Sequence, residues 1–550
     1  MNGADAMVKC LEMEGVKAVF GYPGVAICPF YNSILDSEIE SVLVRTEQNA
    51  AHAASGLARV SDQVGVCAVT SGPGATNLIT GIATAFADSI PMVCITGQVN
   101  SELIGSDVFQ EADITGAVES FVKYSYLVKD VEDIPRIFKE AFHIANTGRK
   151  GPVLIDVPID VQLAAISKFK YPQEVKLRTY KPTVKGNMVQ IKKVAKELSK
   201  AKRPLICAGG GVLLSDAKEV LYQFAHKYQV PVVSTMMGIG VMPTEDDMYF
   251  GMVGNNGHPY ANRAMNECDL LLMVGARVAD RAVNQPDLII NNKVLVHIDV
   301  DPAEIGKNVG PHIPLVGDCK SIFEDLMEQE ITGDFTDWTE QLNYYEATMQ
   351  RKRNPSPEYV DPAAFIRTIS ELLPEDAVYV ADVGQNQIWS CNYHIVKKGH
   401  FLTSGGMGTM GYSIPAAMGA KYQCPEKEVV AVCGDGSFQM SMMELATMRQ
   451  HGIRSKVIVL RNNYLGMVRQ YQHFTYEDHY SVVDLTGSPD LSKIAAAYDM
   501  PYYLVEKNDR IEERLKAFLQ DERASLMEVV IDPMDLVSVS YTHLTLPTNR

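Results

Sequence analysis

The sequence has no long hydrophobic run and no basic leader. Its longest apolar stretches, such as 429–433 and 457–460, have the length of a β-strand. A helix that crosses a membrane needs about 20 apolar residues, so we expect no membrane segment. The first five residues, Met-Asn-Gly-Ala-Asp, do not begin a basic region followed by an apolar one, so we expect no secretory signal peptide.

Positive charge and paired cysteines are also scarce. The 50 basic and 67 acidic residues give a net charge of −17, which repels nucleic acid and anionic membranes. The ten cysteines stand singly, without a Cys-x-x-Cys pair. This pattern disfavours a disulfide framework or a zinc site and is typical of the reducing cytoplasm. We therefore expect a cytoplasmic protein that binds neither nucleic acid nor a membrane.

The sequence does contain repeated α/β patterns. A chain of 550 residues is too long for one hydrophobic core, and its 46% hydrophobic and 21% charged residues are ordinary for globular domains. Short strand-like runs alternate with helical patterns, which predicts parallel sheets covered by helices. We predict an α/β protein with three doubly wound parallel-sheet domains, at 1–165, 186–330 and 362–536. Between them lie a segment rich in Lys, Pro and Tyr at 168–185 and a charged helix with a proline-rich turn at 333–361.

Two predicted strands of the third segment end in polar residues. Asp435 follows the apolar run 429–433, and Asn462, 27 positions later, follows the run 456–460. A helix predicted at 440–449 completes one right-handed βαβ crossover, so both residues should reach the same edge of the sheet. A carboxylate, an amide oxygen and a nearby backbone carbonyl are ligands suited to Mg²⁺.

The glycines beside Asp435 indicate a phosphate group as well. Gly434 and Gly436 let the backbone approach a diphosphate, and Ser437 is expected to begin a helix whose N-terminus favours anions. An ordinary βα turn followed by an asparagine-rich loop is the alternative, and Gly-Asp-Gly-Ser alone would favour it. The paired strand ends at this spacing favour the site for Mg²⁺ and a diphosphate.

Gly-Asp-Gly followed by Asn462 resembles the binding motif of thiamine-diphosphate enzymes. Asn462 is preferred to Asn463 because the following Leu-Gly-Met-Val run aligns with the same run in that family. The segment Gly-Gln-Asn that ends at Asn386 resembles the family's diphosphate-binding Gly-Gln-His, with asparagine in place of histidine. The resemblance implies that the metal is held by Asp435, Asn462 and the carbonyl of Tyr464, and the cofactor by Gln385, Asn386, Asp435, Gly436, Ser437 and Met467.

Glu47 is the candidate for the activating acid. Thiamine diphosphate deprotonates its own thiazolium carbon when a carboxylic acid bonds N1′ of the aminopyrimidine and favours the imino tautomer. Glu47 follows the strand-like run 41–44 and precedes a helix rich in small residues. Taken alone, a glutamate at a helix start is usually a solvated first-turn residue. Its Arg-x-Glu-Gln setting resembles that of the family's catalytic glutamate, although Thr46 stands where the family normally has histidine.

The segment 404–411, Ser-Gly-Gly-Met-Gly-Thr-Met-Gly, contains a G-x-G-x-x-G pattern. A dinucleotide fingerprint is disfavoured because 400–403 makes a poor long strand. By resemblance, the carbonyl of Gly408 accepts a hydrogen bond from the pyrimidine 4′-amino group, and Met410 holds the cofactor in its bent form. An unbranched, polarizable side chain suits such packing, although without the resemblance Met410 would be interpreted as a core residue.

Nearly the whole chain, from about residue 3 to 536, resembles acetolactate synthase large subunits. The matching stretches are 21–24, 70–77, 95–99 and 107–113. In that family the equivalents of Phe109 and Gln110 line the active site, with the amide near the reacting groups. Gly24, in the first stretch, is expected to contact the cofactor.

The resemblance implies a transferase of branched-chain amino-acid biosynthesis, on the routes to isoleucine and valine. An acetolactate synthase decarboxylates pyruvate on thiamine diphosphate and transfers the two-carbon unit to pyruvate or 2-oxobutyrate. A pyruvate oxidase-like enzyme is the near alternative. A catalytically impaired truncated chain and a non-catalytic chain that keeps the fold are further alternatives, and a dehydrogenase ranks last.

The middle segment resembles the flavin domain of the same family. A glycine loop after a strand accepts a diphosphate, and an acid at a strand end holds ribose hydroxyls. The implied FAD contacts are Gly209, Gly210, Gly211, Thr235, Met236, Arg277, Arg281, Asp299 and Val300. FAD would have a structural role, because the reaction needs no redox turnover. The alternative is an empty nucleotide-type domain, which the superfamily also contains.

Three departures from the family pattern stand out. The family's Pro-Lys-Asp has Ile159 in place of lysine, which removes a cation near flavin or substrate. The family's Gln-Trp has Tyr471 in place of tryptophan, which leaves the choice between pyruvate and 2-oxobutyrate open. Residues 538–550 resemble nothing in the family, and we expect a foreign tail on a truncated chain.

The expected partners follow from the same resemblance. Glu47 and the diphosphate ligands fall on different predicted domains. In the resembling families such groups meet across a subunit interface, so we expect a homodimer or a homotetramer. A small regulatory subunit is a further expected partner, and small 2-oxoacids are the expected substrates.

Overall fold

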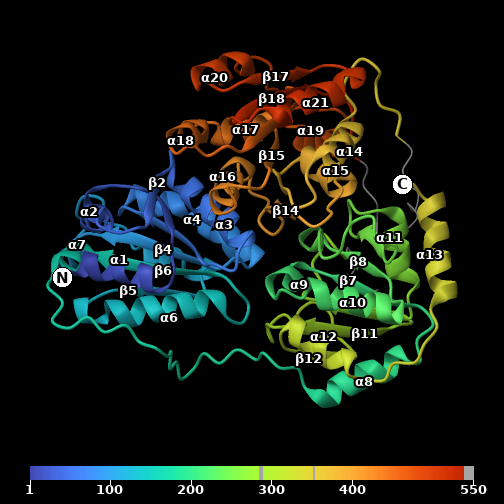
Figure 1. Cartoon of the computed structure of the whole chain (residues 1–550), viewed down its shortest axis with the longest axis horizontal. Coiled ribbons are helices and arrows are strands. Elements are labelled where there is room, and N and C mark those ends of the chain that lie inside the picture. Colours follow the sequence, from blue (N-terminus) through green and yellow to red (C-terminus); the bar gives the residue numbers. More distant parts are fainter. Residues whose placement is uncertain (284–288, 351–352, 538–550) are drawn as a thin grey trace.

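Three separate six-stranded sheets make up the protein (Figure 1). The computed structural model of the chain describes residues 1–283, 289–350 and 353–537. Every pairing between named strands is parallel, and helices pack around each sheet. This confirms the predicted fold class of three doubly wound parallel-sheet domains. In the described ranges, no helix combines the length and the apolar character needed to cross a membrane.

The N-terminal sheet contains β1 (Ala18–Tyr22), β2 (Glu40–Leu43), β3 (Gly65–Val69), β4 (Met92–Gln98), β5 (Tyr124–Leu127) and β6 (Pro152–Pro158). Its helices are α1 (Gly3–Met13), α2 (Cys28–Ile34), α3 (Glu47–Arg59), α4 (Pro73–Asp88), α5 (Ile114–Ala117), α6 (Ile134–Asn146) and α7 (Ile159–Leu163). The central strands β3, β4 and β6 are buried along their whole length, which explains their nearly continuous apolar sequences.

The central sheet contains β7 (Pro204–Ala208), β8 (Val232–Ser234), β9 (Tyr249–Met252), β10 (Leu270–Val274), β11 (Val294–Asp299) and β12 (Ile313–Val316). Its helices are α8 (Met188–Leu198), α9 (Gly210–Leu214), α10 (Lys218–Tyr228), α11 (Pro259–Glu267) and α12 (Cys319–Met327). The segment 168–185 before it has no regular secondary structure, and α13 (Thr336–Thr348) follows it.

The C-terminal sheet contains β13 (Val378–Ala381), β14 (His400–Thr403), β15 (Val429–Gly434), β16 (Lys456–Arg461), β17 (Tyr502–Val505) and β18 (Ser525–Val530). Its helices are α14 (Pro362–Leu372), α15 (Gln385–Tyr393), α16 (Ser413–Gln423), α17 (Asp435–Ser441), α18 (Glu444–Gln450), α19 (Gly466–Thr475), α20 (Leu491–Ala497) and α21 (Ile511–Gln520).

The strand orders divide the sheets into two types. The N-terminal order is β2-β1-β3-β4-β6-β5 and the C-terminal order is β14-β13-β15-β16-β18-β17, so both domains have the same topology. The central order, β12-β11-β10-β7-β8-β9, is the 3-2-1-4-5-6 arrangement of dinucleotide-binding sheets when it is counted within the domain from the β9 edge. Open α/β sheets bind ligands where the strand order reverses. These points lie between β1 and β3, between β7 and β10, and between β13 and β15.

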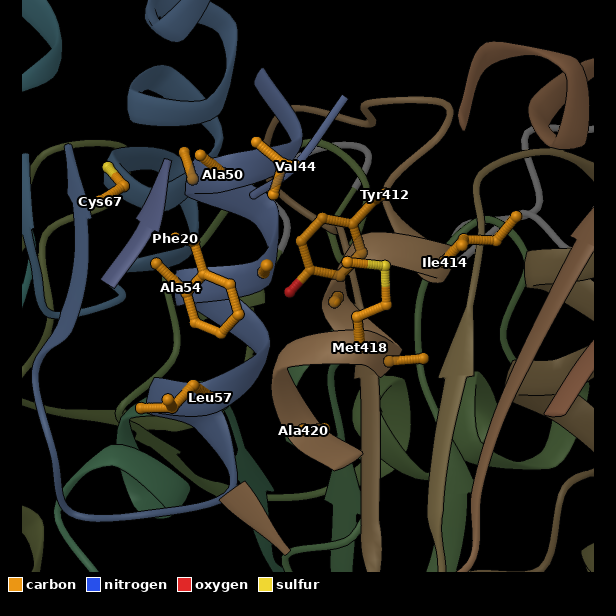
Figure 2. Close-up of a cluster of buried hydrophobic side chains, with 14 of the residues drawn as sticks. Phe20, Val44, Ala50, Ala54, Leu57, Cys67, Tyr412, Ile414, Met418 and Ala420 are labelled. Carbon is orange, nitrogen blue, oxygen red and sulfur yellow. The ribbon is translucent and has the colours of Figure 1, made fainter. Parts of the chain in front are cut away.

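Helices α3 and α16 join the N- and C-terminal domains through close backbone contact (Figure 2). A Cβ added at Gly56 would overlap the carbonyl of Ala416, and one added at Gly419 would overlap the carbonyl of Ala53. The two glycines therefore allow the helices to touch along their backbones. One hydrophobic cluster continues through this junction, from Phe20 to the C-terminal sheet.

The structure corrects the predicted helix at 440–449. Between β15 and β16 the chain forms two short helices, α17 and α18, which are separated at residues 442–443. The first begins at Asp435, directly after the strand, so Ser437 is its third residue and not its first. The second begins with Glu444, whose carboxylate accepts hydrogen bonds from the Arg45 backbone at 2.9 Å and from Asn49 at 2.8 Å. Because the chain starts a new helix at Glu444, the Glu444 carboxylate reaches the N-terminal domain.

Replacing Gly419 with alanine should loosen the junction of the two domains. The added methyl group would meet the Ala53 backbone, so the helices must move apart, and overpacking of this kind costs about 1–3 kcal/mol. We expect a lower melting temperature in thermal unfolding followed by circular dichroism. Gly310→Ala is the matched control, because a Cβ at Gly310 would meet no atom within 4 Å. Equal melting temperatures for the two variants would contradict the close-packing role of Gly419.

Candidate functional site

Asp435 follows β15 at the reversal point of the C-terminal sheet, and the Asn462 loop follows the neighbouring strand β16. Strands β15 and β16 are neighbours, with Gly434 paired to Leu460, so the residues that follow them are adjacent. Asp435 Oδ2 accepts a hydrogen bond from the Asn463 backbone N–H at 2.6 Å, and Asn462 Oδ1 accepts one from Tyr464 N–H at 3.0 Å. Burial raises the pKa of Asp435 to about 6. The Asp435 carboxylate is thus held against the loop that carries Asn462 and Tyr464.

Gln385 and Asn386 stand beside this loop. Asn462 Nδ2 donates to Gln385 Oε1 at 3.3 Å. A Cβ at Gly466 would overlap that Gln385 oxygen, so this position admits only glycine without a shift of the amide. The Oδ1 atom of Asn386 is buried without a hydrogen-bond partner among the described residues. Such an orphaned acceptor is expected where a ligand or its bound water completes the site.

The other predicted diphosphate residues contact the same edge. Ser437 is buried, and its hydroxyl donates to the Val383 carbonyl at 3.3 Å, which ties the end of β15 to the end of β13. A Cβ at Gly436 would lie 2.6 Å from Leu465 and 3.5 Å from the Met410 methyl group. Met410 therefore packs against the glycine that follows Asp435.

The loop 404–411 is held by acids from two domains. Asp382, at the end of β13, accepts from the Gly411 N–H at 2.9 Å and from the Ser413 N–H at 2.8 Å. Asp88, at the end of α4, accepts from the Gly406 N–H at 2.7 Å. Gly408 has a positive φ of 69° and is exposed, so its backbone is free to meet a ligand.

Glu47 and the Gln110 loop both lie against the start of α4, which follows β3 at the reversal point of the N-terminal sheet. Glu47 is the first residue of α3 and is half-buried, and its Oε2 accepts from Asn77 Nδ2 at 3.0 Å. A Cβ at Gly74 would lie 3.3 Å from Glu47 Oε1. A Cβ at Gly72 would lie 2.8 Å from the Gln110 carbonyl. The start of α4 thus lies against both the Glu47 side chain and the Gln110 backbone.

Gly24 belongs to this N-terminal group as well. A Cβ there would lie 2.6 Å from the Thr70 side chain, so the turn after β1 packs closely on the turn after β3. Among the described residues, no hydrogen bond joins the Glu47 group to the Asp435 group of the same chain. The sequence-predicted catalytic acid and the predicted metal ligands therefore occupy two different sheet edges.

A cavity of about 880 Å³ opens between all three sheets. Sites for cofactors commonly measure about 300–1,000 Å³. The predicted residues that line it are Gly210, Gly211, Thr235, Met236, Arg277, Arg281, Asp299, Val300, Gly408 and Met467. Gly209 has a different role: its N–H donates to the Val274 carbonyl at 2.9 Å, and a Cβ there would overlap the Gly275 carbonyl. Met467, which the motif grouped with the Asp435 loop, faces the cavity.

Arg149 is a cavity residue that sequence reasoning missed. It comes from the N-terminal domain, and its guanidinium pairs with Glu304 at 2.8 Å and with Asp301 at 3.4 Å in the central domain. Its Nε also donates to Ser89 at 3.0 Å. The only local signal is a Gly-Arg-Lys-Gly turn, which has the composition of an ordinary surface loop.

Asp299 is a buried acid on the cavity wall. It ends β11 and is 8% exposed. Its pKa is raised to about 6, mainly by burial; the negative charges of Asp301 and Glu304 also raise it, while the Asp301 N–H and the charge of Arg149 lower it. Perturbed carboxyl groups of this kind concentrate in functional sites.

Three family models of thiamine pyrophosphate enzymes match the chain. The N-terminal TPP binding domain matches residues 1–117, the central domain matches 191–326, and the C-terminal TPP binding domain matches 382–529. These ranges include the Glu47, Asp299 and Asp435 regions respectively.

The chain is also similar over almost its whole length to curated relatives. It is 43% identical to the "Probable acetolactate synthase large subunit" of Methanocaldococcus jannaschii, over 97% of this chain and 93% of that protein. It is 41% identical to the acetolactate synthase large subunit of Haemophilus influenzae, over 98% of this chain and 96% of that protein. The same-named protein of Lactococcus lactis subsp. lactis is 40% identical, over 98% of this chain and 93% of the relative.

Asp299→Asn should stabilise the protein prepared without any cofactor. The unfolded chain loses the Asp299 proton near 3.8, whereas the folded chain keeps it up to about 6. Stability is therefore lost as the pH rises from about 4 to about 6, and the full loss persists above that range. The variant should be more stable than the wild type by up to about 3 kcal/mol at about pH 7, and equal to it near pH 4.

The measurement is thermal unfolding of both proteins across this pH range. Asp280→Asn is the control, because that carboxylate lies on the same cavity wall and its side chain is 84% exposed. A pH-independent difference between Asp299→Asn and the wild type would show that ionisation of Asp299 does not destabilise the fold.

Proposed function

Because the chain belongs to the acetolactate synthase large-subunit family of thiamine pyrophosphate enzymes, we propose that it is an acetolactate synthase. The proposed reaction decarboxylates pyruvate and transfers the two-carbon unit to pyruvate or 2-oxobutyrate. One structural observation supports it above the others: Gln385 and Asp435, which follow the strands on either side of the reversal point of the C-terminal sheet, both hydrogen-bond to the loop of Asn462 and Asn463. Its place would be in the biosynthesis of isoleucine and valine.

Mg²⁺ and the diphosphate fit the residues at this edge. The oxygen donors are one carboxylate from Asp435, one amide from Asn462 and the carbonyl of Tyr464. Mg²⁺ is usually bound by one or two carboxylates together with phosphate oxygens. In keeping with this, the described residues contain no group of three or more His, Cys, Asp or Glu suited to a metal. The buried Asn386 Oδ1, unpaired among the described residues, offers the ligand an acceptor. The glycines at 436 and 466 have no side chains and leave room for it.

When bound, thiamine diphosphate supplies the electron sink that lets a 2-oxoacid lose CO2. The chain's own contribution begins with Glu47, which is proposed to hold a proton toward the aminopyrimidine. Asn77 orients this carboxyl group by donating to Oε2 and leaves Oε1 toward Gly74. The carbonyl of Gly408 and the side chain of Met410 would hold the cofactor's shape, and Gln110 would present its amide to the reacting groups.

FAD is the proposed occupant of the cavity between the sheets. Three observations support it. The central sheet has the strand order of dinucleotide-binding domains, and its reversal point lies between β7 and β10. Gly211 and Gly275 touch there, with the Gly211 N–H donating to the Gly275 carbonyl at 2.9 Å. Asp299 ends the next strand, where an acid can hold ribose hydroxyls. The proposed role of FAD is structural.

The working assembly is proposed to contain at least two copies of the chain, as a homodimer or a homotetramer. Within one chain, Glu47 and Asp435 follow strands of two different sheets. This supports the proposal, because a single active site needs both. A small subunit is proposed as a further partner, since the relatives are named large subunits. The ten cysteines are all unpaired, which supports a reducing cytoplasm as the location.

The domain boundaries are proposed to lie at 1–165, 186–330 and 362–536. Each range contains one complete sheet, and the irregular segment 168–185 and helix α13 fall between them. The proposed foreign tail at 538–550 lies outside the described residues.

Glu47→Gln should abolish acetolactate formation. The amide cannot hold the carboxylic proton, and loss of a general acid–base group lowers the rate by about 10²–10⁴-fold. The purified chain is incubated with pyruvate, thiamine diphosphate, Mg²⁺ and FAD, each omitted in turn, and acetolactate is measured. Glu119→Gln, an exposed glutamate of the same domain, is the control and should retain full activity. Oxygen uptake with acetyl phosphate as product would instead support a pyruvate oxidase-like enzyme.

Asp435→Asn should raise the Mg²⁺ concentration needed for half-maximal activity by at least about tenfold, because a neutral amide replaces the one charged ligand. Chelation of the metal should remove activity from the wild type reversibly. Asp484→Asn is the control, since Asp484 lies on the segment that bridges to Tyr464 and is exposed. An unchanged Mg²⁺ requirement in Asp435→Asn would remove Asp435 from the metal site.

A further inference from the structure

A buried amide–carboxylate pair lies on the neighbouring central strands β4 and β6 of the N-terminal sheet. Gln98 is the last residue of β4 and is 4% exposed, and Asp156 lies in the neighbouring strand β6 and is 2% exposed. Placing polar groups in such surroundings is unfavourable unless they are fully hydrogen-bonded. Burial raises the pKa of Asp156 to about 7, while its bonds to Thr96 and Gln98 oppose the rise.

Every polar atom of the Gln98 amide is engaged. Its Nε2 donates to Asp156 Oδ2 at 3.0 Å and to the Ala112 carbonyl at 2.8 Å. Its Oε1 accepts from the Val99 N–H at 2.9 Å. Two donors and one acceptor are thereby used, so the amide has only one orientation that satisfies the network. Asp156 also accepts from the Thr96 hydroxyl at 2.6 Å, and Thr96 makes no bond to Ala112.

The Ala112 carbonyl belongs to the loop that carries Gln110. Gln110 has a positive φ of 60°, a conformation that non-glycine side chains seldom adopt and that the surroundings must maintain. On one side Gly72 touches the Gln110 backbone, and on the other Gln98 holds the carbonyl two residues later. The neighbouring Phe109 is 88% exposed, so the loop has little apolar packing of its own at this point.

We propose that Gln98 is a positioning residue that sets where Gln110 stands relative to Glu47. Its amide is the connection between the sheet, through Asp156, and the loop, through Ala112. The start of α4 then fixes the other side, because Gly72 contacts Gln110 and Gly74 contacts Glu47. The inference rests on the proposed function, in which Gln110 presents its amide to the reacting groups.

Two variants separate positioning from general stability. Gln98→Leu removes the bond to the loop and keeps a side chain of similar size. Thr96→Val removes the other bond to the same carboxylate and leaves Gln98 and Ala112 in place, so it is the matched control. Both should lower the melting temperature, and only Gln98→Leu should change the loop.

The first measurement does not depend on activity. Hydrogen–deuterium exchange of the wild-type holoenzyme and both variants reports the protection of peptides covering residues 105–113. Loss of one buried hydrogen bond predicts exchange at least about tenfold faster in Gln98→Leu and unchanged exchange in Thr96→Val. Equal protection of this segment in all three proteins would overturn the proposal, whether or not the wild type forms acetolactate.

The second measurement is a double-mutant cycle on acetolactate formation. Gln98→Leu should lower kcat for pyruvate by about tenfold while the half-saturating thiamine diphosphate stays within about twofold. If Gln98 acts through Gln110, adding Gln98→Leu to Gln110→Ala should cause little further loss. Losses that multiply in the double variant would overturn the proposal. Failure of the proposed function would give a different result. The wild type would form no acetolactate, while residues 105–113 would still be more protected from exchange in the wild type than in Gln98→Leu.

Discussion

The contact of α3 with α16 holds together the two domains that carry Glu47 and Asp435. Two glycines bring these helices into backbone contact, and the hydrophobic cluster around Leu57, Tyr412 and Met418 closes over the crossing (Figure 2). Helix α3 begins with Glu47, and the chain enters α16 from the loop 404–411. The crossing of the two helices therefore fixes the position of Glu47 relative to that loop. A hydrogen bond of 2.9 Å between the Ser55 and Tyr412 hydroxyl groups also joins the two domains at this crossing.

The loop 404–411 contributes to two sites, the cavity between the sheets and the edge that carries Asp435. Its first half lines the cavity between the sheets, and its second half brings Met410 against Gly436 beside Asp435. Asp88 and Thr84 of α4 hold it from the N-terminal domain, the latter through a 2.7 Å hydrogen bond with Thr409. A ligand in the cavity would contact the same segment that packs beside Asp435 at the C-terminal edge. The structural role proposed for FAD can be understood from this shared segment.

Sequence periodicity was sufficient for the fold class, whereas most residues of the candidate site were assigned through the resemblance to a known family. Buried parallel strands have apolar runs that end in glycine and polar residues, so Asp435 and Asn462 could be placed at strand ends without coordinates. Neither the break between α17 and α18 nor the position of Arg149 could be predicted. Both depend on partners far along the chain, and a lone arginine or glutamate gives no periodic signal.

The same limit applies to networks that use common residue types. Gln98 and Asp156 are separated by 58 positions, and only the parallel register of β4 and β6 brings their strands together. Gln98 lies in one of the stretches that match the family, 95–99. The match does not show which groups the Gln98 amide bonds. Coordinates were needed because a buried amide is informative only through the identity of its partners.

The replacement of a family lysine by Ile159 illustrates how position decides the meaning of a substitution. Among the described residues that line the cavity, four are cations, namely Arg149, Lys150, Arg277 and Arg281, and Ile159 is not one of the lining residues. Ile159 begins α7, directly after β6, and its neighbour Asp160 accepts hydrogen bonds from Ser101 beyond the end of β4. The missing cation therefore concerns the Gln98 edge of the N-terminal sheet, where the loop of Gln110 is held. The loss of this charge falls beside the strand end that holds the Gln110 loop, because Pro158, the residue before Ile159, pairs with Gln98.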